Sequence, residues 1–185
     1  MADTRIGIVG AGGRMGRMLI QTVAATSGAV LSGGIERPGS EAVGRDLGEL
    51  AGLGPLSLKV GDDATALIAL SDVLIDFTSP ASTTATAKLA SERQVAYVIG
   101  TTGISAEEEA EIAEAATHTP IVKAGNMSLG VNLLVNLVEQ VAKALDPDFD
   151  IEIVEMHHKH KVDAPSGTAL MLGEAAAKGR EVALE

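Results

Sequence analysis

The chain has 185 residues, 46% of them hydrophobic but only 2% aromatic, and 25 acidic against 14 basic side chains give a formal net charge of -11. This charge has the wrong sign for a protein that must neutralise many phosphates, so nucleic acid is not an expected partner. The absence of Cys excludes disulfides, thiolate zinc sites and thiol catalysis, and no apolar run approaches the roughly 20 residues of a membrane span. With no signal-peptide pattern at the start, we expect a soluble cytoplasmic protein.

Short apolar runs alternate with longer amphipathic stretches over the first 124 residues. The apolar runs predict strands at residues 5–9, 29–35, 73–77, 95–99 and 121–123, with a weaker candidate at 56–60. The stretches between them predict helices at residues 13–25, 63–70, 80–91 and 105–117. Strands that alternate with helices at this spacing are typical of a parallel sheet with crossovers on both faces. We therefore expect a doubly wound, Rossmann-type α/β domain.

The pattern changes after residue 126. Residues 128–145 predict one long helix, with an apolar stripe at Leu134, Leu137, Val138, Val141 and Leu145. Residues 149–156 alternate as a less hydrophobic strand, which is typical of a sheet with one wet face. We expect a dinucleotide-binding domain over residues 1–126 and a partial α+β substrate-binding and oligomerisation domain over residues 127–185.

The segment IGIVGAGGRMGR, residues 6–17, predicts a strand, a glycine-rich turn and the start of a helix. Gly10, Gly13 and Gly16 follow a G-x-x-G-x-x-G spacing, and such a turn lets the backbone approach a pyrophosphate at a helix N-terminus. Glu36 ends the second predicted strand, where a carboxylate can bind the hydroxyls of an adenosine ribose. These features favour a nicotinamide dinucleotide site; a tight structural turn is the alternative.

Arg37, next to Glu36, affects the choice of cofactor. A carboxylate repels a 2′-phosphate, whereas a guanidinium can bind that phosphate or stack on adenine. The pair predicts tolerance of both NADH and NADPH, with an exposed surface ion pair as the alternative. Two further loops, residues 100–103 and 124–128, follow predicted strands and are expected to border the nicotinamide; ordinary helix capping remains open for each.

The segment EMHHKHKVDAPSGTAL, residues 155–170, concentrates positive and titratable side chains directly before a predicted helix start at Ser166. The unpaired amides of Gly167 and Thr168, helped by Lys161 and the histidines, could bind a carboxylate. The expected substrate is an organic acid with one or two carboxylates. A metal site, a solvated basic stretch, and a nucleophilic rather than capping Ser166 are the alternatives.

These segments together resemble the dihydrodipicolinate reductase family, whose members serve the diaminopimelate route to lysine. The resemblance lies in VGAGGRMGR near the start, GTTG at residues 100–103, AGNMSLGVN at residues 124–132 and, above all, the segment at residues 155–170. It implies a Rossmann domain, a mixed α+β substrate domain and a homotetramer. Because family members continue well beyond residue 185, it also implies that part of the substrate domain is missing here.

The resemblance implies a role for each matching residue. His157 would be the acid/base group and Lys161 the proton donor, while His158, Gly167 and Thr168 would hold the substrate carboxylates. No metal is implied. The cofactor, NADH or NADPH, would contact Gly10, Ala11, Gly12, Gly13, Arg14, Met15, Glu36, Arg37, Gly100, Thr101, Thr102, Ala124, Gly125, Asn126 and Met127.

The chemistry suits these residue types. Reduction of a cyclic imine dicarboxylate needs a hydride and proton transfers, and an imidazole titrates close to neutral pH. A cationic pocket that holds two carboxylates would position the ring for the hydride. Two rival functions remain, another two-domain amino-acid dehydrogenase and a non-catalytic NAD(H)-binding sensor; the latter usually carries a basic DNA-reading module, and none is visible.

Overall fold

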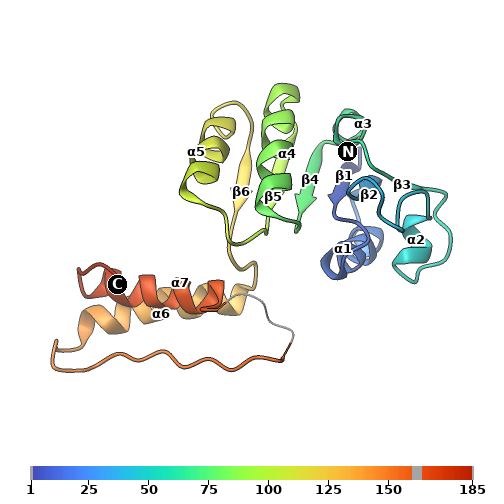
Figure 1. The fold of residues 1–185 in the computed structure, drawn as a ribbon. Coiled ribbons are helices and arrows are strands. Elements are labelled where there is room, and N and C mark those ends of the chain that lie inside the picture. Colours follow the sequence, from blue (N-terminus) through green and yellow to red (C-terminus); the bar gives the residue numbers. More distant parts are fainter. Residues whose placement is uncertain (1, 160–163, 185) are drawn as a thin grey trace. The chain divides into compact units, whose positions relative to one another are not determined.

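The computed structural model of the chain describes residues 2–159 and 164–184. The chain divides into two compact units, Met1–Lys123 and Ala124–Glu185. Each unit has its own helices (Figure 1).

The first unit contains one parallel sheet. Its strands are β1 (Thr4–Val9), β2 (Ala29–Ile35), β3 (Val60–Gly61), β4 (Val73–Asp76), β5 (Ala96–Ile99) and β6 (Ile121–Lys123). Their order across the sheet is β3-β2-β1-β4-β5-β6, and every named pair is parallel. The chain moves outward from β1 in one direction and then returns to add β4 on its other side. This order confirms the predicted doubly wound fold and places a topological switch point between β1 and β4.

Five helices cover this sheet: α1 (Arg14–Ala25), α2 (Leu47–Leu50), α3 (Ala64–Leu70), α4 (Pro80–Arg93) and α5 (Ala106–Ala115). Successive side chains of a strand point to opposite faces, and β1 shows this clearly. Fully buried Ile8 belongs to a core cluster with residues of α1 and α2, whereas Val9 belongs to a second cluster with residues of α3, α4 and α5. The sheet therefore has a core on both faces that is aliphatic except for buried Tyr97, as the near absence of aromatic residues predicts.

Most predicted element ends are confirmed to within two residues. Proline stands at the first position of α4, and α5 begins with a capping box in which Ser105 and Glu108 exchange hydrogen bonds. The weaker strand candidate shrinks to the two residues of β3. The short helix α2 was not predicted; it forms because the carboxylate of Asp46 accepts hydrogen bonds from the amides of Gly48 and Glu49.

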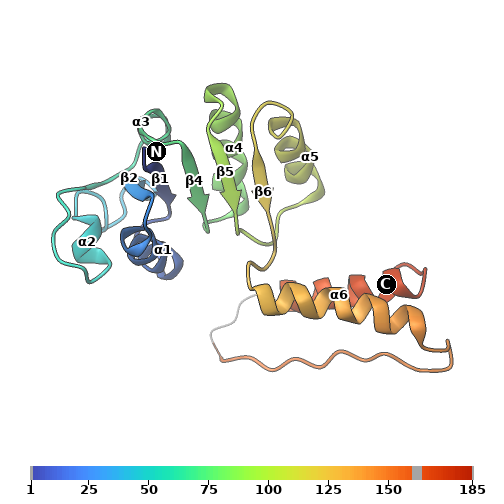
Figure 2. The same cartoon turned by 180° about the vertical axis from the view of Figure 1, so that it is seen from behind.

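The second unit is built on two packed helices, α6 (Leu129–Ala144) and α7 (Gly167–Gly179) (Figure 2). The helices approach closely at Gly179, where an added Cβ would lie 2.4 Å from the carbonyl oxygen of Glu139. Glycine is therefore the residue that permits this contact. α6 is the longest helix in the described residues, and no helix among them is both long and apolar enough to cross a membrane.

The strand predicted over residues 149–156 is wrong. Residues 150–158 form no strand, although the predicted alternation survives in their burial. Ile151 and Ile153, each 42% exposed, line a hollow against α7, whereas Val154 and Met156 are 88% and 92% exposed. A strand needs a hydrogen-bonded neighbour, and no strand pairs with this segment in the described part of the second unit. The periodicity correctly identified an inward face but not a sheet.

Candidate dinucleotide and anion sites

The glycine-rich turn between β1 and α1 has a geometry that only glycine permits. Gly10 has φ +80, in the left-handed region. At Gly16 an added Cβ would lie 2.1 Å from the carbonyl oxygen of Gly10, closer than any side chain could pack. Gly13 caps α1 without a side-chain hydrogen bond, and the first turn holds no acidic residue. The amides that begin α1 can therefore bind an anion.

The other turn residues occupy different environments. Ala11 is fully buried and packs in the core, so only its backbone can reach a ligand, whereas Arg14 and Met15 are exposed on the first turn of α1. Gly12 donates its amide hydrogen to Oε1 of Glu36 at 2.9 Å. This contact joins the glycine turn to the end of β2.

Glu36 and Arg37 lie beside a hollow of about 550 Å³ at the carboxyl ends of β1, β2 and β4. The structure therefore brings the turn and the predicted acidic and basic residues to one place. The residues that line the hollow are Val9, Gly10, Ile35, Glu36, Arg37, Pro38, Asp62, Ala64, Thr78, Ser79, Ser82, Ala85, Thr86 and Leu89. A crevice at the switch point of a parallel sheet is the usual ligand position in this fold class.

Sequence reasoning missed Thr78 and its neighbour Asp76. An added Cβ on Gly10 would lie 2.6 Å from Cγ2 of Thr78, so the loop after β4 closely approaches the glycine turn. Thr78 follows the strand predicted at residues 73–77, and Asp76 lies next to the end of that strand, so the rule that ligands bind at carboxyl ends of strands could have identified them.

The buried carboxylate of Asp76 connects two of these loops. It accepts hydrogen bonds from the amide of Thr78 at 2.8 Å, from the Thr78 hydroxyl at 2.6 Å and from the Thr83 hydroxyl at 3.1 Å. It also accepts one from the phenol of Tyr97. Thr101 joins the network because its hydroxyl lies 2.8 Å from the Thr83 hydroxyl and accepts from the Thr78 amide at 3.0 Å. Asp76 thus connects the loop after β4 with the loop after β5 through hydrogen bonds.

The Gly100–Thr102 segment follows β5, and its residues differ in exposure. Thr101 is buried in the Asp76 network, whereas Thr102 is exposed. At Gly100 an added Cβ would lie 2.1 Å from the ring of Phe77, so glycine allows that ring to pack beneath the loop. Ordinary helix capping does not account for this segment, because the cap of α5 is Ser105.

The predicted loop at Ala124, Gly125, Asn126 and Met127 lies in the second unit. Asn126 forms the centre of its contacts: Nδ2 donates to Oγ1 of Thr168 at 3.0 Å, and Oδ1 accepts from the amide of Ser128 at 2.8 Å. Gly125 faces the side chain of Met171. The structure therefore brings this predicted cofactor loop against the start of α7.

The histidine segment is tied to α7 by Glu155. His157 Nε2 lies 2.7 Å from Oε2 of Glu155, and Oε1 of the same carboxylate accepts the amide hydrogen of Ser166 at 2.8 Å. Ser166 is the N-cap of α7, with its hydroxyl accepting from the amide of Ala169. Ser166 therefore acts as a helix cap, as expected for Ser directly before a helix, and the alternative of a nucleophile is not needed to explain it.

Gly167 and Thr168 are the first two residues of α7, where helical amides lack intrahelical partners. His158 directly follows His157 on the exposed segment. Lys161 lies outside the described residues. Among residues 2–159 and 164–184, no three His, Asp or Glu side chains form a group that could hold a metal ion.

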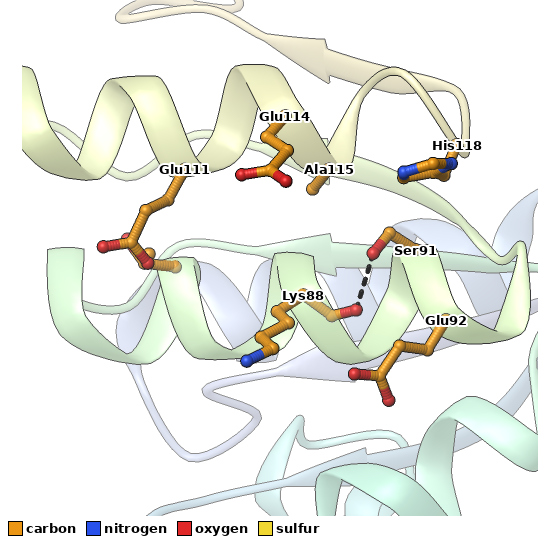
Figure 3. A pocket seen from close by; sticks show the side chains of 8 residues that line it. Lys88, Ser91, Glu92, Glu111, Glu114, Ala115 and His118 are labelled. Atoms are coloured by element: carbon orange, nitrogen blue, oxygen red, sulfur yellow. Dashed lines mark hydrogen bonds between the residues drawn. The ribbon is translucent and has the colours of Figure 1, made fainter.

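A separate hollow of about 390 Å³ lies between α4 and α5 (Figure 3). Lys88 and Glu92 line it from α4, while Glu111 and Glu114 line it from α5. It contains none of the predicted site residues. Its mixed charges are those of two solvated helix faces, and Ser91 uses its hydroxyl to bond the Lys88 carbonyl.

Comparison with known proteins covers the chain almost end to end. The family model for the N-terminus of dihydrodipicolinate reductase matches residues 4–127, and that for its C-terminus matches residues 130–184. A 4-hydroxy-tetrahydrodipicolinate reductase of Chelativorans sp. is 58% identical over 185 residues, which are 100% of this chain and 67% of that protein. The reductase of Parvibaculum lavamentivorans is 60% identical, over 100% of this chain and 68% of its own length.

A solved structure agrees with these matches. The dipicolinate-bound dihydrodipicolinate reductase from Paenisporosarcina sp. TG-14 aligns with a TM-score of 0.75 at 28% identity, over 96% of this chain and 67% of that one. The chain thus spans about two thirds of the length of these relatives. On the strength of both matching halves and this identity, the chain belongs to the dihydrodipicolinate reductase family.

Proposed function

We propose that the chain carries the site with which a 4-hydroxy-tetrahydrodipicolinate reductase transfers a hydride from NADH or NADPH to its substrate, in the diaminopimelate route to lysine. The observation that carries this proposal is the pair of family models that match residues 4–127 and 130–184, with relatives of that name at 58% and 60% identity.

The residues of the first unit fit a nicotinamide dinucleotide. Without side chains at Gly10 and Gly16 the backbone can approach a pyrophosphate, and the first amides of α1 have no competing acidic side chain. The carboxylate of Glu36, beside the hollow of about 550 Å³, would bind the adenosine ribose, with Arg37 next to it. When bound, the cofactor supplies the hydride. Gly10 to Met15, Glu36, Arg37 and Gly100 to Thr102 are the proposed contacts from this unit.

The second unit carries the other proposed contacts. Ala124 to Met127 would contact the cofactor, and His158, Gly167 and Thr168 would hold the carboxylates of a small dicarboxylate. The related reductase solved with dipicolinate binds a ligand of this class. Helix amides favour carboxylates, and the start of α7 has no acidic residue in its first turn. His157 would exchange a proton with the substrate, and Lys161 would donate one.

The proposal extends to organisation. Residues 1–126 would form the dinucleotide-binding domain and residues 127–185 the substrate-binding and oligomerisation domain. Several large apolar side chains of α6 are exposed, among them Leu129 at 85% and Leu133 at 58%. Exposed apolar surface of this kind supports assembly, which in the family resemblance is a homotetramer in the cytoplasm.

The test is the loss of NADH and NADPH absorbance in the presence of freshly prepared 4-hydroxy-tetrahydrodipicolinate. Turnover that stops when this substrate is replaced by aspartate semialdehyde or omitted supports the proposal. Binding of NADH without turnover would instead indicate a sensor, and turnover of a different amino-acid precursor a different dehydrogenase.

Variants of the adenosine end provide a second arm. Glu36→Ala should weaken the binding of NADH more than the binding of NADPH, with a relative change of about tenfold. The reason is that the carboxylate binds the ribose hydroxyls of NADH but repels the 2′-phosphate of NADPH. Arg37→Ala should weaken NADPH more. Equal effects of both variants on both cofactors would place the adenosine elsewhere.

A further inference from the structure

Glu155 contacts His157, which the proposed function uses, and Ser166, which caps α7, although Glu155 is not itself one of the proposed site residues. One carboxylate oxygen accepts the amide hydrogen of Ser166 at 2.8 Å, and the other lies 2.7 Å from Nε2 of His157. The first contact joins positions eleven apart in the chain. Glu155 therefore ties the segment that carries the histidines to the residue that caps α7.

The carboxylate is oriented as well as bound. Ile153, two residues earlier on the same side of the segment, packs within 3.7 Å of the Cβ position of Gly173 in α7. Glu155 itself lies at the edge of an apolar hollow that Ala169, Leu170 and Leu184 also line. The side chain is 27% exposed. A carboxylate held at both oxygens and packed on one side has little freedom to swing away from His157.

Glu155 is ionised at neutral pH. Its hydrogen bonds from Ser166 and His157 lower the pKa of Glu155 to about 2. An ionised carboxylate offers only acceptors, so each group that bonds to it must supply a hydrogen. The Ser166 amide does so necessarily, and His157 must therefore present a hydrogen on Nε2.

This requirement determines the state of the other ring nitrogen. In a neutral imidazole one nitrogen carries the hydrogen and the other carries the lone pair, and the bond made by one fixes the role of the other. With hydrogen on Nε2, the lone pair of His157 lies on Nδ1. We propose that Glu155 is the positioning residue of His157: it holds the imidazole at the start of α7 as the Nε2–H tautomer, so that Nδ1 is the atom that exchanges a proton with the substrate. This inference rests on the proposed function for the proton exchange, but the tautomer itself can be measured without substrate.

Glu155→Gln is the decisive substitution because it keeps the shape and changes the hydrogen-bond inventory. A glutamine amide has one acceptor oxygen and one donor nitrogen, whereas Ser166 and the Nε2–H tautomer both require acceptors. If the amide oxygen stays on Ser166, the amide nitrogen faces His157, and Nε2 must then accept. The variant should therefore convert His157 to the Nδ1–H tautomer.

The measurement is ¹⁵N NMR of the ligand-free chain labelled at its four histidines, at a pH where the imidazoles are neutral. Nitrogens that carry hydrogen and nitrogens that carry a lone pair resonate far apart, and His157→Asn identifies the signals of His157. Wild type should show hydrogen on Nε2, and Glu155→Gln should show hydrogen on Nδ1. Glu152→Gln is the matched control, since Glu152 is an exposed residue of the same segment, and it should leave the spectrum of His157 unchanged.

The wild-type spectrum tests the tautomer without any variant, so the test does not depend on whether Glu155→Gln folds. Hydrogen on Nδ1 in wild type, or the same tautomer in wild type and folded Glu155→Gln, would overturn it.

In the reductase assay Glu155→Gln should lower kcat about 10²-fold, with little change in the KM for NADH, while Glu152→Gln stays near wild type. An inactive wild type with the expected tautomer would contradict the proposed function alone. An active wild type with the other tautomer would contradict the role of Glu155 alone.

Discussion

The side-chain amide of Asn126 donates a hydrogen bond to the hydroxyl of Thr168 at 3.0 Å. The two residues come from segments with different proposed ligands. Asn126 belongs to the loop before α6, which would contact the cofactor, and Thr168 belongs to the first turn of α7, which would hold the substrate. Asn126 also accepts from the amide of Ser128, and its own carbonyl accepts from Asn132 of α6. One side chain therefore links the proposed cofactor loop, the start of α6 and the start of α7.

The Asn126–Thr168 contact should appear as a coupling energy. Asn126→Ala and Thr168→Val each remove one partner, and the double variant removes both. We expect a coupling of about 0.5–1.5 kcal/mol in the free energy of unfolding, measured by urea unfolding followed by circular dichroism. Additive effects of the two substitutions would mean that the hydrogen bond contributes nothing to stability.

The phenol of Tyr97 should resist ionisation in the folded chain. Burial is the main cause that raises the pKa of Tyr97, and the neighbouring charge of Asp76 raises it further. The chain has one Tyr and no Trp, so tyrosinate absorbance reports on this residue alone. We expect no tyrosinate in the native chain at pH values around the usual tyrosine pKa of about 10.

The same shift predicts how stability depends on alkaline pH. The unfolded chain releases the Tyr97 proton near the usual value, whereas the folded chain retains it, so stability falls as the pH rises above about 10. Ionisation and loss of circular dichroism should therefore occur together in one transition. Tyrosinate that forms while the helices remain intact would contradict the buried Tyr97–Asp76 contact.

Gly16→Ala should disrupt the glycine turn. Its Cβ would lie 2.1 Å from the carbonyl oxygen of Gly10 and 2.8 Å from Cα of Ala11, and backbone atoms cannot rotate away as side chains can. We expect destabilisation of about 1–3 kcal/mol together with loss of measurable NADH binding by calorimetry. Gly28→Ala is the control: Gly28 has φ +81 but open space around it, so it should lose some stability and keep NADH binding.

The carboxyl of Asp72 should titrate well below its ordinary range. Hydrogen bonds from Arg5 lower the pKa of Asp72 from 3.8 to about 2, and the guanidinium lies 2.7 Å from the carboxylate. Because the folded-state pKa is the lower one, this contribution to stability is present above about pH 4 and is lost as the pH falls toward 2. Carboxyl ¹³C titration by NMR measures it directly. Arg5→Gln should return the pKa part of the way toward 3.8, because the backbone amide of residue 5 still donates to Asp72, whereas an unchanged value would exclude the ion pair as the cause.

Much of the first unit follows from local sequence. The alternation of apolar runs with amphipathic stretches predicts the strands and helices of a doubly wound sheet, because each element must bury one face against its neighbours. The capping box at Ser105 and the proline of α4 mark two helix starts for equally local reasons. The glycine turn is readable for the same reason, since its shape depends on backbone conformations near Gly10.

The contacts that organise the candidate sites could not be read in this way. Asp76 gathers groups from positions as far apart as Thr78 and Thr101, and only the parallel pairing of β4 with β5 brings these together. Glu155 reaches Ser166 across eleven positions of chain. At residues 149–156 local alternation even predicted the wrong element, because a strand also requires a partner.

The sequence by itself determined the order of elements in the parallel sheet, the glycine turn and the caps at Ser105 and Ser166, since these depend on periodicity and on residues close together in the chain. The tertiary structure decided which polar groups face one another, namely the Gly12 amide with Glu36, Asp76 with Tyr97, and Asn126 with Thr168. The physical reason is that buried polar groups must find partners wherever the packing of apolar faces places them, and that packing is a property of the whole fold.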